Sequence, residues 1–358
     1  MTTRHANFDN VVCPAPLVDD EHVLLGHGSG GRLTADLIHR LFLRGYGNEL
    51  LAALEDQATV FIKGNPSSRV RIAFTTDSFV VHPLFFPGGD IGRLAVCGTV
   101  NDLAVGGATP LFLSAAFILE EGLPTADLKR IVDSMRAACD EAGVSLVTGD
   151  TKVVDRGKAD KVFITTSGIG LVPDERRLSV SNARPGDRVL VSGTMGDHGI
   201  ALMSVREGLE FETVLESDCA PLHDLARAML EAAPDIRWMR DPTRGGLSSA
   251  LNELAAASQV GVRIAEPAIP VRPEVRAACE LLGLDPLYVA NEGKLIAVAP
   301  PEDAERLLAA MHAHPLGRNA AIIGEIMDDH PGMVVQTSLI GGTRVVAMLA
   351  GEQLPRIC

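Results

Sequence analysis

Residues 100–108 read VNDLAVGGA, an apolar stretch in which Asp102 stands beside small residues and glycines. Other aspartates occupy the same kind of position at the ends of apolar runs, namely Asp56 in EDQATV, Asp77 in TTDS and Asp150 in TGDTKVV. Mg²⁺ prefers carboxylate oxygens and keeps water and phosphate as its other ligands. Four carboxylates gathered at one rim could therefore hold a magnesium–triphosphate complex, although each aspartate alone is more simply a cap or turn residue.

Strand-like and helix-like segments alternate around these aspartates, from about residue 22 to residue 172. Residues 69–75 are β-prone, whereas residues 125–142 have the apolar periodicity of an amphipathic helix and stop at Gly143. Residues 173–187 are polar and rich in turn-forming types, which places a domain boundary there. The first half is therefore predicted to be an α/β domain.

The second half mixes α and β again. Its elements are expected as a strand at 188–192, a helix at 246–257, a strand at 294–299, a helix at 302–312 and a strand-rich segment at 333–349. A length of 358 residues fits about two domains. The predicted organisation is a poorly ordered leader at 1–21, an N-terminal domain at 22–172, a C-terminal α+β domain at 188–349 and a mobile tail at 350–358.

Composition and charge exclude several classes of protein. A net charge of −14 argues against nucleic-acid binding, which needs a basic face. No apolar run reaches the ~18 residues of a membrane span, and the N-terminus lacks the apolar core of a signal peptide. The six cysteines include no CxxC pair and are too sparse for a secreted disulfide scaffold, so a reducing cytoplasm fits best. Cys97, Cys139 and Cys279 stand in apolar surroundings and are expected in the core.

Two glycine-rich loops stand before helix-like stretches, GHGSGGR at 26–32 and DPTRGGL at 241–247. Glycines let a backbone approach a phosphate, and a helix N-terminus offers free N–H groups and partial positive charge. The candidate phosphate-binding glycines are Gly28, Gly30, Gly31, Gly245 and Gly246. Either loop could instead be a plain turn or cap. His27 and His198 also flank glycines, but no spacing supports a metal–histidine site.

Three further residues are candidates for chemistry. Lys152, two residues after Asp150, could neutralise a transferring phosphoryl group, or it could be a solvated surface lysine. Glu292, just before the expected strand at 294–299, could act as a base or belong to a polar turn. Cys358 ends the chain, so its thiol could carry a covalent adduct into a site elsewhere, although a chance cysteine at a frayed end is the simpler interpretation.

Taken together, these strings resemble the HypE family of hydrogenase maturation proteins, which are carbamoyl dehydratases. The matching strings include HGSGGR (27–32), EDQA (55–58), TDS (76–78), HPLFFPGG (82–89), NDLAVGGA (101–108), FILEEGLP (117–124), TGDTKVV (148–154), SGTMGDHG (192–199), DPTRGG (241–246), NEGKL (291–295) and PRIC (355–358). The resemblance runs from about residue 22 to the end of the chain. The aspartate strings alone would indicate only the wider PurM-like superfamily, which includes aminoimidazole ribonucleotide synthetase, selenide water dikinase and thiamine monophosphate kinase.

The resemblance implies a two-domain α/β and α+β fold whose N-terminal sheet pairs with a second copy into a dimeric, barrel-like core with a flexible C-terminal tail. It also implies that ATP drives dehydration of a carbamoyl group on Cys358 to a thiocyanate, which supplies cyanide to the iron of nickel–iron hydrogenase. The implied partners are HypF, which delivers the carbamoyl group, and a HypC–HypD complex, which holds the iron.

The same resemblance implies roles for individual residues. The positions that match the family's magnesium–nucleotide carboxylates are Asp56, Asp77, Asp102 and Asp150. Lys152 is expected to stabilise charge at the carbamoyl oxygen and phosphate, and Glu292 to take the proton from the carbamoyl nitrogen. An ordinary glutamate has a pKa of about 4.3, so Glu292 would need burial or an acidic neighbour to be an effective base.

Two other functions stay open at this stage. One is a small-molecule, ATP-dependent synthetase or kinase of the same superfamily, and the other is a non-enzymatic thiol carrier or scaffold. The terminal cysteine separates them, because a free-substrate enzyme would not need it. The carboxylate of Cys358 itself disfavours a thiolate, so we expect the partner's site to activate this thiol. Pro355 is expected to stiffen the tail.

Overall fold

The computed structural model describes residues 22–63, 69–208, 215–351, 354 and 356–358. The predicted leader and the stiffening expected of Pro355 lie outside the described residues. The N-terminal half is built on a five-stranded sheet of order β1-β2-β7-β5-β6. Its strands are β1 (Ala58–Lys63), β2 (Arg69–Phe79), β5 (Thr109–Glu120), β6 (Ser145–Val154) and β7 (Val162–Leu171). Within the described residues this sheet is open, with β1 and β6 at its edges, so one chain forms no closed barrel.

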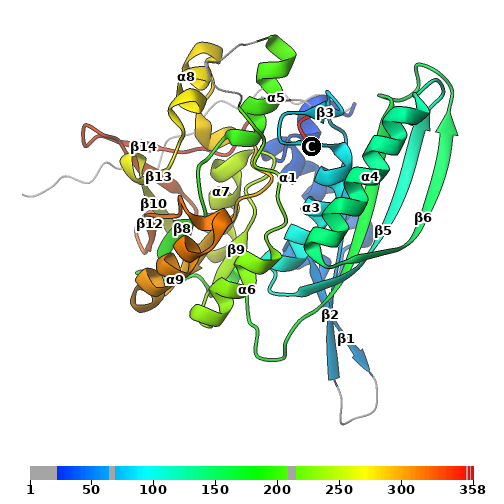
Figure 1. Ribbon diagram of the computed structural model, residues 1–358. Helices are drawn as coiled ribbons and strands as arrows, with labels where there is room; N and C mark the ends of the chain where they lie inside the picture. Colours follow the sequence, from blue (N-terminus) through cyan, green and yellow to red (C-terminus); the bar gives the residue numbers. More distant parts are fainter. Residues whose placement is uncertain (1–21, 64–68, 209–214, 352–353, 355) are drawn as a thin grey trace, which may run out of the picture.

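One face of the sheet is covered by two helices, α3 (Ile91–Val105) and α4 (Thr125–Ala142), which lie between the sheet and the second half of the chain (Figure 1). The side chain of Asp90 caps α3 by accepting hydrogen bonds from the backbone of Gly92 and Arg93. Strands β5 and β6 are parallel, and α4 is the crossover that a parallel pair requires. The helix has the bounds predicted from its periodicity, and Gly143 ends it with φ 65°.

The other face of this sheet presents apolar side chains to solvent. The register aligns Phe74 of β2 with Ile169 of β7, and Ile169 with Phe112 of β5, so the three form one row. Phe74 is 48% exposed, Ile169 39% and Phe112 46%. Every residue of β6 from Ser145 to Val153 is also exposed. An uncovered apolar row of this kind is typical of a surface that another molecule covers.

The C-terminal half contains a seven-stranded sheet of order β14-β13-β10-β12-β8-β11-β9. Its strands are β8 (Arg188–Val191), β9 (Trp238–Arg240), β10 (Gly261–Ala265), β11 (Ile296–Ala299), β12 (Ala321–Met327), β13 (Val334–Thr337) and β14 (Thr343–Val345). The helices around it are α5 (Asp197–Glu207), α6 (His223–Ala232), α7 (Gly246–Ser258), α8 (Pro273–Leu282) and α9 (Pro301–Ala313). The helices and strands predicted for this half are confirmed with ends that differ by a residue or two, and the segment predicted as strand-rich at 333–349 contains β13 and β14.

Short elements complete the fold. They are the 3-10 turns η1 (Leu25–Gly28), η3 (Leu51–Ala53), η4 (Val180–Asn182), η5 (Glu266–Ala268), η6 (Pro286–Tyr288) and η7 (Pro315–Gly317), the π-helical turn η2 (Ile38–Phe42), helices α1 (Arg32–Leu37) and α2 (Leu43–Tyr46), and the hairpin of β3 (Phe85–Phe86) and β4 (Gly89–Asp90). Cys97, Cys139 and Cys279 are buried, as predicted. Among the described residues, no helix is long and apolar enough to cross a bilayer.

The two halves meet along α3. Ala104 and Val105 at its end are buried in one apolar cluster with Leu222 and Leu225 of the second half. Asn101, which is completely buried, donates from its side-chain amide to the backbone oxygens of Ala220 and Glu292 and accepts a hydrogen bond from the backbone of Leu222. These bonds satisfy every polar atom of a buried amide, so α3 and the segment at Glu292 keep a fixed relation.

Candidate active site

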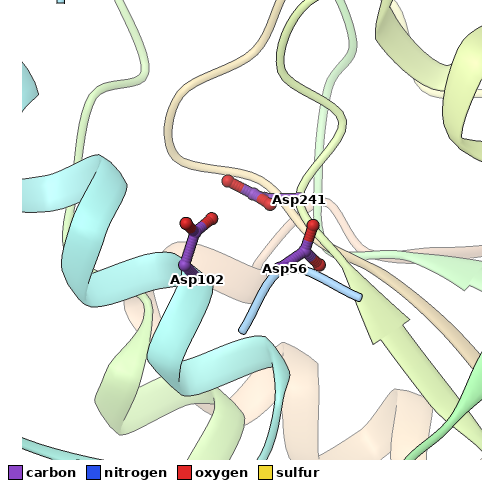
Figure 2. Close-up of side chains that lie close together, drawn as sticks. All are labelled: Asp56, Asp102 and Asp241. Carbon is purple, nitrogen blue, oxygen red and sulfur yellow. The ribbon is translucent and has the colours of Figure 1, made fainter. Parts of the chain in front are cut away.

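Three carboxylates from distant parts of the sequence converge where the halves meet. Asp56 lies just before β1, Asp102 on α3 and Asp241 just after β9, and Figure 2 shows the three side chains gathered together. Each offers a carboxylate oxygen, and these atoms all lie within 4.8 Å of one another. Burial raises the pKa of Asp102, the charges of Asp241 and Asp56 raise it further, and burial raises the pKa of Asp241 to about 6. Ionised together, the three would repel one another unless a cation lay between them.

Arg240 supplies part of that positive charge. Its Nε lies 2.8 Å from Asp56 Oδ1, and its guanidinium also pairs with Glu253 at 3.2 Å. Arg240 pairs with Asp56 and Glu253, whereas among the described residues neither Asp102 nor Asp241 forms an ion pair within 4.0 Å. Hard oxygen donors at this spacing, with excess negative charge, are the donor set that Mg²⁺ takes in proteins.

The four aspartates predicted from sequence fall into three places. Asp56 and Asp102 come together, and they are joined by Asp241, which sequence reasoning assigned to a phosphate loop. Asp77, at the end of β2, lies 4.0 Å from Arg244 and accepts a hydrogen bond from the backbone of Ser78. The only local signal for Asp241 is its position directly after a short apolar strand, which it shares with many turn aspartates.

Asp150 lies apart from the cluster in this chain. It stands on β6, where its side chain is 65% exposed, and Lys152 lies 2.8 Å away with 69% exposure. The hydrogen bond from Lys152 lowers the pKa of Asp150. The register pairs Asp150 with Ala116 and Lys152 with Ile118, which puts both on the uncovered face of the sheet.

Three adjoining cavities lie beside the carboxylate cluster, and Asp241 lines one of them. The apolar cavity, of about 710 Å³, is lined by residues that include Leu54, Val180, Trp238, Arg240, Glu253 and Met348. The glycine cavity, of about 200 Å³, is lined by residues that include Gly30, Thr34, Arg240, Asp241, Arg244 and Gly246. The tail cavity, of about 220 Å³, is lined by residues that include Gly28, Ser29, Ser78, Arg244, Gly245 and Cys358. Arg240 is shared by the first two and Arg244 by the last two, so the cavities follow one another in space.

The predicted glycines form these walls, and three of them, Gly30, Gly245 and Gly246, combine a positive φ with a position that an added Cβ could not occupy. Gly30 has φ +72°, and an added Cβ would lie 2.7 Å from the Cβ of Arg244. Gly246 has φ +60°, and an added Cβ would lie 2.6 Å from the backbone oxygen of Val289. The loop at 26–32 therefore approaches Arg244 closely because Gly30 lacks a side chain, and Gly246 packs in the same way against the segment at 287–289. Gly31 also lines the apolar cavity.

Glu292 is held in a buried, acidic position. Glu292 is 2% exposed, and its backbone nitrogen donates a hydrogen bond to Asp218 Oδ1 at 3.0 Å. Lys294 pairs with the other oxygen of Asp218 at 3.3 Å. Burial, followed by the charges of Asp241 and Asp218, holds the pKa of Glu292 well above its ordinary value. Among the described residues Glu292 Oε1 is buried and has no hydrogen-bond partner.

The tail is docked against its own chain, whereas the sequence predicts a mobile segment with little to bury. The backbone of Val80 donates to the main-chain oxygen of Cys358 at 2.9 Å, and that of His82 donates to the oxygen of Arg356 at 3.2 Å. Ile357, 4% exposed, joins the core of the N-terminal half. Burial of one isoleucine contributes about 1.5–3 kcal/mol, which explains why the tail docks.

This docking brings Cys358 into the tail cavity beside Arg244. Burial raises the pKa of the Cys358 thiol well above its ordinary value, Arg244 lowers it, and Glu292 raises it. The direction agrees with the expectation that this thiol is not activated by its own tail, although burial rather than the terminal carboxylate is the main cause. His27 stays within its own turn, where its Nδ1 accepts a hydrogen bond from the backbone of Leu24.

Fold and site together define a PurM-like enzyme of the AIR synthase-related class. Residues 55–172 match the family described as AIR synthase related protein, N-terminal domain, and residues 184–336 match the corresponding C-terminal domain. The chain is 60% identical over 332 residues to the carbamoyl dehydratase HypE of Azotobacter vinelandii, a match that spans 93% of this chain and 96% of the relative. The chain therefore belongs to the HypE family of carbamoyl dehydratases.

Two solved structures show the same similarity in three dimensions. A HypE crystal structure in complex with ATP matches with a TM-score of 0.78 and 49% identity, over 94% of this chain and 100% of that chain. A chain in a crystal structure of a HypE–HypF complex matches with a TM-score of 0.81 and 48% identity, over 87% of this chain and 99% of that chain.

Proposed function

We propose that this chain uses ATP to dehydrate a carbamoyl group carried on Cys358, which gives a thiocyanate and so the cyanide ligand of nickel–iron hydrogenase. The observation that carries the proposal is the place of Cys358, in a cavity that shares Arg244 with the cavity next to the carboxylates. A chain end that docks beside a nucleotide-sized site suits a substrate carrier. An enzyme that acts on a free substrate would leave this cavity open.

ATP fits two of the three cavities, with the adenosine in one and the triphosphate in the next. The apolar cavity, next to Trp238, is large enough for the adenosine, and the glycine cavity, which Arg240 and Arg244 line, takes the triphosphate. Asp56, Asp102 and Asp241 would hold Mg²⁺, which would supply positive charge to the phosphates of the nucleotide. The related HypE structure with ATP supports nucleotide binding at this fold.

The chemistry follows from the poor leaving ability of an amide oxygen. The carbamoyl oxygen attacks the γ-phosphorus of ATP, ADP leaves, and one nitrogen proton is lost to give an imidate phosphate. Glu292 takes the second nitrogen proton, the C≡N bond closes, and the former carbamoyl oxygen leaves on phosphate. A raised pKa suits Glu292 to this step, because a base works best when its pKa lies near the working pH.

We assign to Arg244 the stabilisation of charge at the transferred group. It lines both the tail cavity and the glycine cavity, and it lies 4.0 Å from Asp77. A guanidinium at that position would stabilise negative charge that develops on the carbamoyl oxygen and phosphate. Sequence reasoning gave this role to Lys152, which lies on the outer face of the sheet in this chain.

A homodimer would bring Lys152 to the site. Ladder pairing aligns Ser78 with Thr165, Thr165 with Ala116 and Ala116 with Asp150, so one row crosses the uncovered face from the tail cavity to β6. A second copy packed on this face would bury its apolar row. Strand β6 of that second copy would also cover the tail cavity of the first copy, next to Ser78. We infer that Lys152 and Asp150 act on the tail of the partner copy, within a barrel-like pair of sheets.

The partners follow from the two other steps of the cycle. HypF would load the carbamoyl group, in agreement with the related HypE–HypF complex, and a HypC–HypD complex would take the cyanide on its iron. Cys358 is partly buried in the docked tail, so loading requires the tail to leave the cavity. The cycle would take place in the cytoplasm, as the cysteine usage indicates.

Isotope transfer tests this mechanism. Cys358 is loaded with a carbamoyl group whose oxygen is oxygen-18, and Mg-ATP is then added. The label should appear in the phosphate that is released. Its appearance in water would contradict the imidate phosphate. Hydrolysis of ATP that persists in Cys358→Ser with an added small substrate would instead favour a free-substrate kinase or synthetase, and no hydrolysis under loading would favour a carrier.

A further inference from the structure

His198 contacts the tail from a fully buried position, although no step of the reaction uses it. It lies in the first turn of α5, with its Nε2 2.8 Å from the carbonyl oxygen of Ile357 and its Nδ1 2.8 Å from Ser217 Oγ. A carbonyl oxygen only accepts, so Nε2 must carry the proton and donate it. Burial lowers the pKa of His198, so the ring is neutral and Nδ1 accepts from the Ser217 hydroxyl.

The ring is held in this tautomer and orientation by its surroundings. The Ser217 oxygen also accepts a hydrogen bond from the backbone of Cys219 at 3.1 Å, which turns the hydroxyl proton towards His198. The backbone of Ser217 is tied to the oxygen of Pro87 at 2.8 Å. The ring of Phe86 meets that of His198 edge to face, with 5.6 Å between centroids. The donor that faces the tail is therefore fixed before the tail arrives.

The two hydrogen bonds at the end of the tail fix the reactive residue between them. His198 holds the oxygen of Ile357, and the backbone of Val80 holds the main-chain oxygen of Cys358 at 2.9 Å. These two oxygens flank the Cα of Cys358, so its backbone cannot rotate while both bonds are made. The thiol, and any group attached to it, then turns only about the side-chain bonds.

We propose that His198 is a positioning residue that sets the depth and orientation at which the loaded Cys358 enters the tail cavity. The inference rests on the proposed function, because it takes the tail to be the substrate carrier. Arg206 adds to the same docking by donating to the oxygens of His82 and Arg356. A displacement of about 1 Å at the reacting atom can lower a rate by roughly a hundredfold, so a residue of this kind contributes to rate without touching the carbamoyl group.

The test uses the full-length protein, free and carbamoyl-loaded, with two readouts. The first is the rate at which iodoacetamide alkylates unloaded Cys358, measured by peptide mass. The second is the single-turnover rate of dehydration with Mg-ATP, with nucleotide affinity measured in parallel. His198→Phe keeps a ring but removes both nitrogens, and His198→Gln returns an N–H near the Nε2 position. Ser217→Ala removes only the group that fixes the tautomer. His312→Phe is the matched control, since His312 of α9 makes a similar hydrogen bond to the backbone oxygen of Ala320.

We expect His198→Phe to raise alkylation about tenfold and to lower dehydration at least about tenfold, with unchanged Mg-ATP affinity. His198→Gln should return the alkylation and dehydration rates most of the way to the wild-type values. Ser217→Ala should change the two rates in the same directions as His198→Phe, by a smaller factor. His312→Phe should change neither rate. A folded His198→Phe variant that alters only one readout, or none, overturns the proposal. If that variant does not fold, unchanged values for Ser217→Ala overturn it. If the wild-type protein itself does not dehydrate, the proposed function fails, and alkylation still tests the docking.

Discussion

The backbone nitrogen of Val80 lies 2.9 Å from the main-chain oxygen of Cys358, so the last residue of the chain is held at the end of β2. Asp77 stands three residues earlier, on the same side of the site as Arg244. This hydrogen bond holds the end of the chain near Asp77 and Arg244, so the terminal cysteine has fixed neighbours.

The carboxylate cluster should lower the folding stability of the metal-free protein when its members ionise, because they repel one another. Burial raises the pKa of Asp241 to about 6, so the folded state binds more protons than the unfolded state between about pH 4 and pH 6. In EDTA, stability should therefore fall as pH rises through this range.

Asp241→Asn should weaken that fall, as measured by thermal melting. The same variant should lower Mg-ATP affinity at least about tenfold, as measured by calorimetry. Asp133→Asn removes an exposed carboxylate of α4 and serves as the control. Unchanged Mg-ATP affinity in Asp241→Asn would exclude this residue as a ligand.

Glu292 should set the pH dependence of dehydration. A base must be deprotonated to act, and burial raises the pKa of this carboxyl, so the rate should rise with pH above the range of an ordinary glutamate. Glu292→Gln should lower the single-turnover rate by about a hundredfold or more and leave ATP binding largely intact. The profile is measured on carbamoyl-loaded protein by quenched mass analysis. A wild-type rate in Glu292→Gln would show that another group is the base.

Arg244 should matter for the reaction more than for nucleotide binding. Arg244→Gln removes the charge shared by the tail and glycine cavities, and we expect dehydration to slow about a hundredfold, with Arg244→Lys in between. Arg227→Gln is the control, since Arg227 forms exposed ion pairs on α6. Dehydration at the wild-type rate in Arg244→Gln would remove this residue from the mechanism.

Mixed dimers should show whether Lys152 acts on a partner's tail. Lys152→Ala and Cys358→Ser chains are each expected to be inactive alone, but a mixed dimer contains one site with both residues. Dehydration should return when the two variants are mixed. Glu292→Gln mixed with Cys358→Ser is the control and should stay inactive, because Glu292 lines the site of its own chain's tail. Failure of the first mixture to recover, in a sample shown to exchange subunits, would place Lys152 in its own subunit's site or outside it.

Local patterns predicted much of the fold, because they depend on neighbours in sequence. The apolar periodicity of 125–142 and the glycine after it gave α4 with the observed bounds. The β-prone runs likewise became β2, β8 and β11. Their pairing could not be predicted from periodicity, because it depends on contacts between segments far apart in the chain.

For the site as well, local patterns identified single residues, whereas contacts between distant residues could not be predicted. Asp56 and Asp102 were found as carboxylates at the ends of apolar runs, but their joining with Asp241 depends on how the two halves pack. The docking of the tail was missed because Ile357 belongs to no apolar periodicity that would mark a buried segment. Its partners are the backbone of 80–82 and the ring of His198, neither of which has a sequence signal that points to residue 357.

The most direct test of the account is the intact mass of the protein after HypF has loaded Cys358. Addition of Mg-ATP should remove the mass of one water molecule, the change should map to Cys358, and one phosphate should be released for each water lost. A carbamoyl adduct that persists with Mg-ATP present, in protein shown to bind the nucleotide, would contradict the account.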